Sequence, residues 1–92
     1  MIRSFRHKGL AELWETGRSA KLDARMFHRL LTRLENLNAA STAEEMNIPG
    51  YDFHSLRGFD PTRYTVHVNG PWCITFSFEN GGATAIDFEQ YH

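Results

Sequence analysis

The sequence predicts an α+β fold in which two N-terminal helices pack on one face of a mostly antiparallel sheet of four or five strands. Hydrophobic residues recur with a helical period in the N-terminal part, and apolar and polar residues alternate with a period of two after residue 51. The chain has 92 residues, 41% of them hydrophobic, which suits one core and not two. We therefore expect a single domain spanning residues 1–92.

The N-terminal part predicts a short strand and then two helices. Residues 1–5 alternate as a strand does, and a first helix is expected over about residues 8–15, with Gly17 as its stop. The second helix should begin near Asp23, a residue type suited to the N-cap, and end at about residue 38. Its apolar face holds six residues at helical spacing: Leu22, Met26, Phe27, Leu30, Leu34 and Leu37. Residues 39–51 read as a connection with one irregular turn.

The C-terminal part predicts four strands joined by turns. Residues 53–56 form the first strand, and the turn at residues 58–61 leads into a second strand over residues 64–68. Asn69-Gly70 marks a tight hairpin before the central strand at residues 72–79. The turn at residues 80–82 precedes the last strand, which runs to about residue 90.

The composition excludes several classes of protein. One cysteine, Cys73, gives neither an internal disulfide nor a zinc site, and no spacing of ligands suggests another metal or a cofactor. No apolar run resembles a signal peptide or reaches the roughly 20 residues that cross a bilayer. We expect a cytoplasmic protein with no membrane contact.

The charges are distributed unevenly. The net charge is −1, but residues 1–33 carry a net charge of +5 and residues 34–92 carry −6. Lys21, Arg25, Arg29 and Arg33 are four residues apart, and like charges at that spacing destabilise a helix slightly. Such a row is either a solvated face or a surface that docks on an RNA backbone.

Two groups of residues suit proton transfer near neutral pH. His54 lies in a predicted strand with Arg57 three residues on, and Tyr91 and His92 end the chain directly after the last predicted strand. The structural alternatives are a His54 that bonds to the backbone and a Tyr91 that covers the edge of the sheet. Trp72 is expected in the core or as an aromatic at the rim of the site. The other histidines, His7, His28 and His67, are expected to be structural or solvated.

Several short runs, taken in order, resemble the HigB (host inhibition of growth) toxins of the RelE/ParE superfamily of bacterial toxin–antitoxin modules. These runs are Met-Ile-Arg-Ser-Phe at residues 1–5, His-Lys-Gly-Leu at 7–10, Leu56 with Gly58, the strand Trp-Cys-Ile-Thr-Phe at 72–76, and Tyr91-His92. The resemblance implies a RelE-like fold with a curved sheet. It also implies a ribosome-dependent endoribonuclease that cuts mRNA in the A site and is neutralised by a helix-turn-helix antitoxin of the HigA kind. The toxin alone is expected to be a monomer.

The resemblance implies that His54, Tyr91 and His92 are catalytic, with Arg57 at a position that is basic in the family. The chain departs from the family pattern at three positions. Cys73 replaces an expected arginine, Pro71 stands where an asparagine often contacts a base, and Gln90 replaces an acid. Because a guanidinium is the usual partner of a phosphate in a transition state, we expect weak activity unless Arg57 or Arg63 takes over that role.

RNA cleavage without a metal requires a base, an acid and a positive charge at the phosphate. His54 and His92 are expected to act as base and acid in either assignment, with Arg57 at the phosphate and Tyr91 on a base or a phosphate oxygen. Contacts to RNA are expected from seven further residues: Lys21, Arg25, Arg29, Arg63, Trp72, Cys73 and Gln90. The alternatives are a ParE-like inhibitor of DNA gyrase, and an attenuated toxin that mainly binds its antitoxin.

Overall fold

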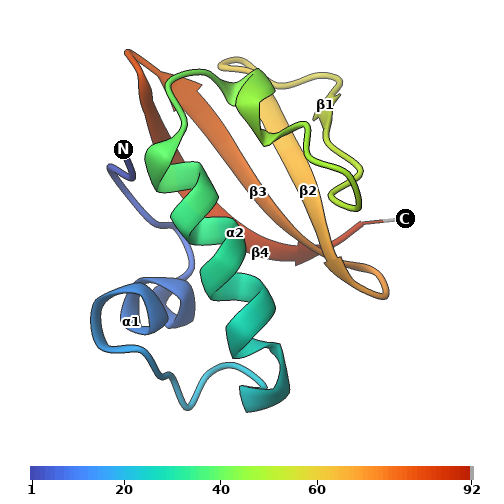
Figure 1. Cartoon of the computed structure of the whole chain (residues 1–92). Coiled ribbons are helices and arrows are strands. Elements are labelled where there is room, and N and C mark those ends of the chain that lie inside the picture. The colour runs from blue at the N-terminus through green and yellow to red at the C-terminus, as the bar shows by residue number, and fades with distance from the viewer. Residues whose placement is uncertain (92) are drawn as a thin grey trace.

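The chain folds as helices on one face of an antiparallel sheet, which confirms the predicted α+β class. The computed structural model describes residues 1–91, with helices α1 (Lys8–Thr16) and α2 (Phe27–Ala39) against four strands (Figure 1). The strands, which pair antiparallel in chain order, are β1 (His54–Leu56), β2 (Arg63–Asn69), β3 (Trp72–Glu79) and β4 (Gly82–Gln90). Two short 3-10 helices, η1 (Ala24–Met26) and η2 (Ala43–Met46), lie at either end of α2.

Helix α1 forms where the sequence predicts it, and local groups fix both ends. At the start, the His7 ring nitrogen Nδ1 accepts a hydrogen bond from the Leu10 N–H at 3.1 Å. At the end, Gly17 adopts the left-handed conformation (φ 85°), and its N–H donates to the Leu13 carbonyl. Gly9 is needed inside the helix, because a Cβ there would lie 2.8 Å from the His7 ring. His7 is therefore a structural residue.

The second predicted helix is broken near its start. Asp23 caps as expected, but it accepts from the Arg25 N–H and so caps the 3-10 helix η1, while α2 begins only at Phe27. Leu22 precedes both elements. The prediction of one helical row through Lys21, Arg25, Arg29 and Arg33 is therefore wrong, because Lys21 and Arg25 lie outside α2.

The first predicted strand is only partly formed. Residues 1–5 run parallel to β4 and touch it through isolated bridges, Ile2 with Ala83 and Phe5 with Ile86. The Arg3 N–H donates to the Ala83 carbonyl at 2.8 Å. The segment therefore covers one edge of the sheet without forming a strand of its own.

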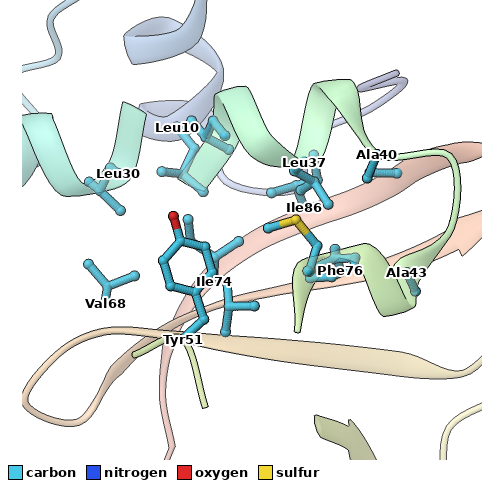
Figure 2. Close-up of a cluster of buried hydrophobic side chains, with 14 of the residues drawn as sticks. Leu10, Leu30, Leu37, Ala40, Ala43, Tyr51, Val68, Ile74, Phe76 and Ile86 are labelled. Carbon is cyan, nitrogen blue, oxygen red and sulfur yellow. The ribbon is translucent and has the colours of Figure 1, made fainter. Parts of the chain in front are cut away.

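The core lies between α2 and the sheet (Figure 2). Leu30, Leu34 and Leu37 form a buried stripe on α2, as their spacing predicts. The sheet contributes a matching set of buried residues, which are Val66, Val68, Ile74, Phe76 and Ile86. Leu10 and Leu13 of α1 and Met46 of η2 also belong to the cluster.

Polar groups attach α2 to β2. The Arg33 Nε donates to the His67 carbonyl at 2.7 Å, and the Arg33 guanidinium lies 4.3 Å from the centre of the Tyr51 ring. The Tyr51 hydroxyl accepts from the Asn36 amide at 2.7 Å, and the Tyr51 carbonyl accepts from the His67 N–H. Burial lowers the pKa of Arg33, which matches a structural role better than a role at the surface.

We predict that Arg33→Ala lowers the free energy of unfolding by about 1–3 kcal/mol, because it removes a charged hydrogen bond and a cation–π contact. Urea denaturation measures the change. Arg18→Ala is the matched control, because Arg18 is exposed and its side chain makes no hydrogen bond in the described part of the chain. Equal stability of the two variants would contradict the anchoring role of Arg33.

Candidate functional site

The sheet has one apolar face and one polar face. Side chains alternate along a strand, so the neighbours of core residues such as Val66, Ile74 and Ile86 point away from the helices. On β2, β3 and β4, ten residues with polar or thiol side chains share this second side, here called the polar face: Arg63, Thr65, His67, Cys73, Thr75, Ser77, Glu79, Thr84, Asp87 and Glu89. Because the helices of residues 1–91 pack on the other face, this gathering of polar groups is the first candidate for a functional site.

Arg63 begins β2 on the polar face and is only 5% exposed. Its guanidinium donates to the Thr75 hydroxyl at 3.0 Å and to the Ser77 hydroxyl at 3.3 Å. The Thr75 hydroxyl in turn donates to the Glu89 carboxylate. Two neutral hydroxyl groups of β3 therefore hold the planar guanidinium in a fixed orientation, and among residues 1–91 it forms no direct ion pair.

The electrostatic surroundings of Arg63 are mixed. Burial lowers its pKa below the usual value, and the charge of Arg6 acts in the same direction. Glu89, Asp87 and Tyr91 act in the opposite direction and favour the charged guanidinium. An arginine so placed remains protonated at neutral pH. The polar face thus combines a fixed, buried positive charge with groups from β4 and from the segment that follows it.

His54 lies on the same face as Thr65. It begins β1 and stands directly opposite Thr65 of β2, and residues opposite one another in an antiparallel pair share a face. The ring is exposed, with Nδ1 2.9 Å from the Asp52 carbonyl oxygen. A neutral ring bonds to that oxygen only when Nδ1 carries the proton, which leaves Nε2 as an acceptor.

The strand register continues the pairing of His54 with Thr65 across the other strands of the sheet. Thr65 stands opposite Thr75, and Thr75 stands opposite Asp87. Thr65 is 1% exposed, and its hydroxyl has no hydrogen-bond partner among residues 1–91. A continuous row of polar groups therefore connects His54 on one edge strand with Asp87 on the other.

Tyr91 is the last residue that the structure describes. Its N–H donates to the Pro71 carbonyl at 2.8 Å, which prolongs the pairing of β3 with β4, and its side chain is 36% exposed. Gln90 precedes it opposite Trp72 and is exposed. The prediction for His92 lies outside the described residues. Arg57 is exposed in the turn after β1, and among residues 1–91 no hydrogen bond joins its side chain to His54.

Cys73 lies on the polar face and is buried. It stands opposite His67 on one side and Glu89 on the other, and its thiol contacts the Pro71 carbonyl at 3.9 Å. The family resemblance implies an arginine at the position of Cys73. This position therefore lies beside the Glu89 carboxylate, which also accepts a hydrogen bond from Thr75. The nearest arginine on the strands of this face is Arg63, which approaches from β2.

The predicted basic residues have different surroundings. Arg25 forms an ion pair with Asp23 at 2.7 Å, and this contact lowers the pKa of Asp23 to about 2. Arg29 donates to the Val68 carbonyl at 3.4 Å and to the Asn69 side chain at 3.3 Å. Lys21 is exposed before η1. All three line two adjoining hollows beside Trp72, on the helix side of the sheet and not on its polar face.

The sequence analysis missed most of the groups that hold Arg63. Thr75, Ser77 and Glu89 contact or approach the guanidinium, yet none was predicted to do so. A signal was present, because each alternates with a core residue on a predicted strand and so had to face away from the helices. The cross-strand register, which brings these residues to Arg63, could not be derived from the sequence.

The described residues hold neither a cluster of metal ligands nor a membrane-spanning helix. Among residues 1–91, no three His, Cys, Asp or Glu side chains gather closely enough to hold a metal ion. No helix in this part of the chain is both long and apolar enough to cross a membrane.

Comparison with known proteins gives concordant results. A sequence model of the family described as the RelE-like toxin of the type II toxin–antitoxin system HigB matches residues 3–92. A curated protein from Proteus vulgaris, named endoribonuclease HigB, is 37% identical over 92 residues, which is the whole length of both chains. The chain therefore belongs to the HigB-like family, whose members are RelE-like toxins of type II toxin–antitoxin systems.

Proposed function

We propose that this protein is a ribosome-dependent endoribonuclease that cleaves translated mRNA in the A site, and that the polar face of the sheet is where it cleaves. The observation that carries the proposal is a fixed guanidinium, Arg63, on the same sheet face as an exposed imidazole, His54. The name of the Proteus vulgaris relative, an endoribonuclease, supports the same activity.

The reaction that fits these groups is attack of a ribose 2′-hydroxyl on the adjacent phosphate. A base removes the hydroxyl proton, the new O–P bond forms, and the 5′-oxygen leaves with a proton from an acid. The products are a 2′,3′-cyclic phosphate and a free 5′-hydroxyl. Charge builds up on the phosphate oxygens in the transition state, so a fixed positive group beside them accelerates the step.

We assign the phosphate contact to Arg63. Thr75 and Ser77 occupy only part of its donor capacity, and the remaining N–H groups can bind a phosphate oxygen. Because the guanidinium is already oriented and largely removed from water, it needs little reorganisation during the reaction. Arg63 thus takes the role that Cys73 cannot fill, and exposed Arg57 supplies a second cation near the incoming RNA.

We assign the base to His54 and the acid to His92. The contact between His54 Nδ1 and the Asp52 carbonyl favours the tautomer whose Nε2 accepts a proton. Tyr91, part-exposed at the end of β4, would stack on a base or bind a phosphate oxygen. Gln90 would contact the RNA beside it.

The partners of the proposed enzyme follow from its class. A type II toxin has an antitoxin, and we propose one of the HigA kind with a helix-turn-helix. The toxin alone would be a monomer in the cytoplasm, and Lys21, Arg25 and Arg29 would contact RNA. Delivery by the ribosome would explain how a protein of net charge −1 reaches RNA.

Mapping of mRNA 5′ ends after induced expression tests the function. We expect new ends within codons of translated messages, and no such ends in a matched message that lacks a start codon. Cuts that ignore translation would contradict ribosome dependence. Stalled replication with intact mRNA would instead identify a gyrase inhibitor, and normal growth with intact mRNA would identify a toxin that only binds its antitoxin.

We predict that His54→Ala lowers cleavage by about 10²–10⁴-fold, because it removes a general acid–base group, without loss of the fold. Mapping of mRNA 5′ ends measures cleavage, and a thermal melt measures the stability of the fold. We expect the same result for His92→Ala. His28→Ala is the control, because His28 is exposed on α2, on the side of the sheet away from the polar face. Toxicity of the His54 variant equal to that of the control would refute the assignment.

We predict that Arg63→Lys lowers kcat about 10- to 100-fold, because an ammonium cannot keep the planar contacts with Thr75 and Ser77 and also bind the phosphate. Single-turnover cleavage on programmed ribosomes measures the change. A folded variant with unchanged kcat would show that Arg63 does not contact the reacting phosphate.

We predict that Cys73→Arg raises cleavage, because it adds a second guanidinium on the polar face beside Glu89. Cys73→Met is the matched control, since it adds bulk at the same buried site without charge. The difference between the two variants in cleavage rate is the measurement. An equal effect of arginine and methionine would mean that position 73 does not act on the phosphate.

A further inference from the structure

The two hollows beside Trp72 form a continuous depression, here called the Trp72 groove. The larger has a volume of about 420 Å³ and the smaller about 290 Å³, and Asp23, Met26 and Trp72 line both. The groove lies between the loop and turn that precede α2 and the end of the sheet where β3 begins.

An aromatic ring held in a fixed orientation borders the groove. Trp72 is half-buried and stacks on Phe88 of β4, with the ring centres 4.7 Å apart and the planes 19° from parallel. This packing holds the indole in place while part of it remains accessible in both hollows. A rigid, part-exposed indole is a suitable surface for stacking of a nucleobase, which every base can do through its π face.

The opposite wall of the groove is basic. Lys21, Arg25 and Arg29 line it and are exposed, against the single carboxylate of Asp23. Arg29 is directed across the groove, because its guanidinium reaches the Asn69 side chain on the β2–β3 hairpin. Basic side chains beside an aromatic ring form the pattern by which proteins bind single-stranded nucleic acid.

The groove is continuous with the end of the sheet that carries Tyr91. Trp72 stands opposite Gln90, and the Tyr91 N–H binds the carbonyl of Pro71, the residue before Trp72. The two aromatic residues therefore flank the same hairpin end, with Trp72 on the helix side and Tyr91 near Arg63 on the polar side. An RNA strand bound on the polar face would enter the groove by passing over this end of the β2–β3 hairpin.

We propose that the Trp72 groove binds a nucleotide of single-stranded RNA next to the segment on the polar face, with its base against Trp72 and its phosphate on Arg25, Arg29 and Lys21. This inference rests on the proposed function for the identity of the ligand as RNA. It adds a second binding site, on the opposite side of the sheet from the cleaved bond. A partner protein with an acidic segment is the competing occupant, and the test distinguishes the two.

Tryptophan fluorescence tests the proposal. The chain has two tryptophans, so Trp14→Phe leaves Trp72 as the only reporter. The titrant is a short 2′-O-methyl oligoribonucleotide, which binds but cannot be cleaved, because the attacking hydroxyl is blocked. We expect saturable quenching of Trp72, and anisotropy of a labelled oligonucleotide with otherwise unaltered protein should give the same Kd.

The triple variant Lys21→Gln, Arg25→Gln and Arg29→Gln should weaken binding about tenfold. It should also reduce the slope of log K against log salt by about 0.7, since the groove is proposed to bind one phosphate and each phosphate contact on a single strand contributes about 0.7. The matched control changes Arg3, Lys8 and Arg18 to Gln, which alters the net charge equally at positions that line neither hollow. The control should bind as tightly as the unaltered protein.

Three results would overturn the inference: no quenching by the oligonucleotide, equal weakening by both triple variants, or quenching by poly-glutamate alone. The last would assign the groove to an acidic protein partner. The outcome is independent of cleavage, because the oligonucleotide cannot react. Binding without cleavage of translated mRNA would refute the proposed function alone, and cleavage without groove binding would refute this inference alone.

Discussion

The alternation of side chains along β2 and β3 is the constraint on which the rest of the structure depends. Every second residue, such as Val66 and Ile74, enters the core under α2, so the residues between them must face the other way. A slip of one residue in register would expose the core and bury the polar row. The packing of the helices on one face therefore fixes the composition of the other face, including the orientation of Arg63.

A buried guanidinium held by hydroxyl groups differs from one held by an ion pair. Thr75 and Ser77 orient Arg63 without neutralising it, and Glu89 is bonded to Thr75 instead of directly to the arginine. The proposed phosphate contact depends on this charge, which the two hydroxyl groups leave in place. This arrangement offers a physical reason why a chain with Cys73 at a position where its relatives are expected to have arginine can still provide a cation on the same face.

The basic residues before and within α2 have separate roles. Arg33 is attached to the backbone of β2 and to the Tyr51 ring, so its charge stabilises the fold. Arg25 and Arg29 remain exposed at the other end of the helix, where a depression and an aromatic ring adjoin them. The sequence spacing grouped all three in one row, although only those near the end of the helix can reach a ligand.

The sequence by itself determined the elements and the faces. The helical spacing of Leu30, Leu34 and Leu37 and the period of two after residue 51 are local properties, and they predicted α1, most of α2 and all four strands. Only the tertiary structure decided which polar groups meet. The contact of Arg63 with Thr75 depends on strand register, and the groove beside Trp72 depends on how the turn before α2 packs near the sheet. Both join residues distant in the chain, and no local pattern encodes such distances.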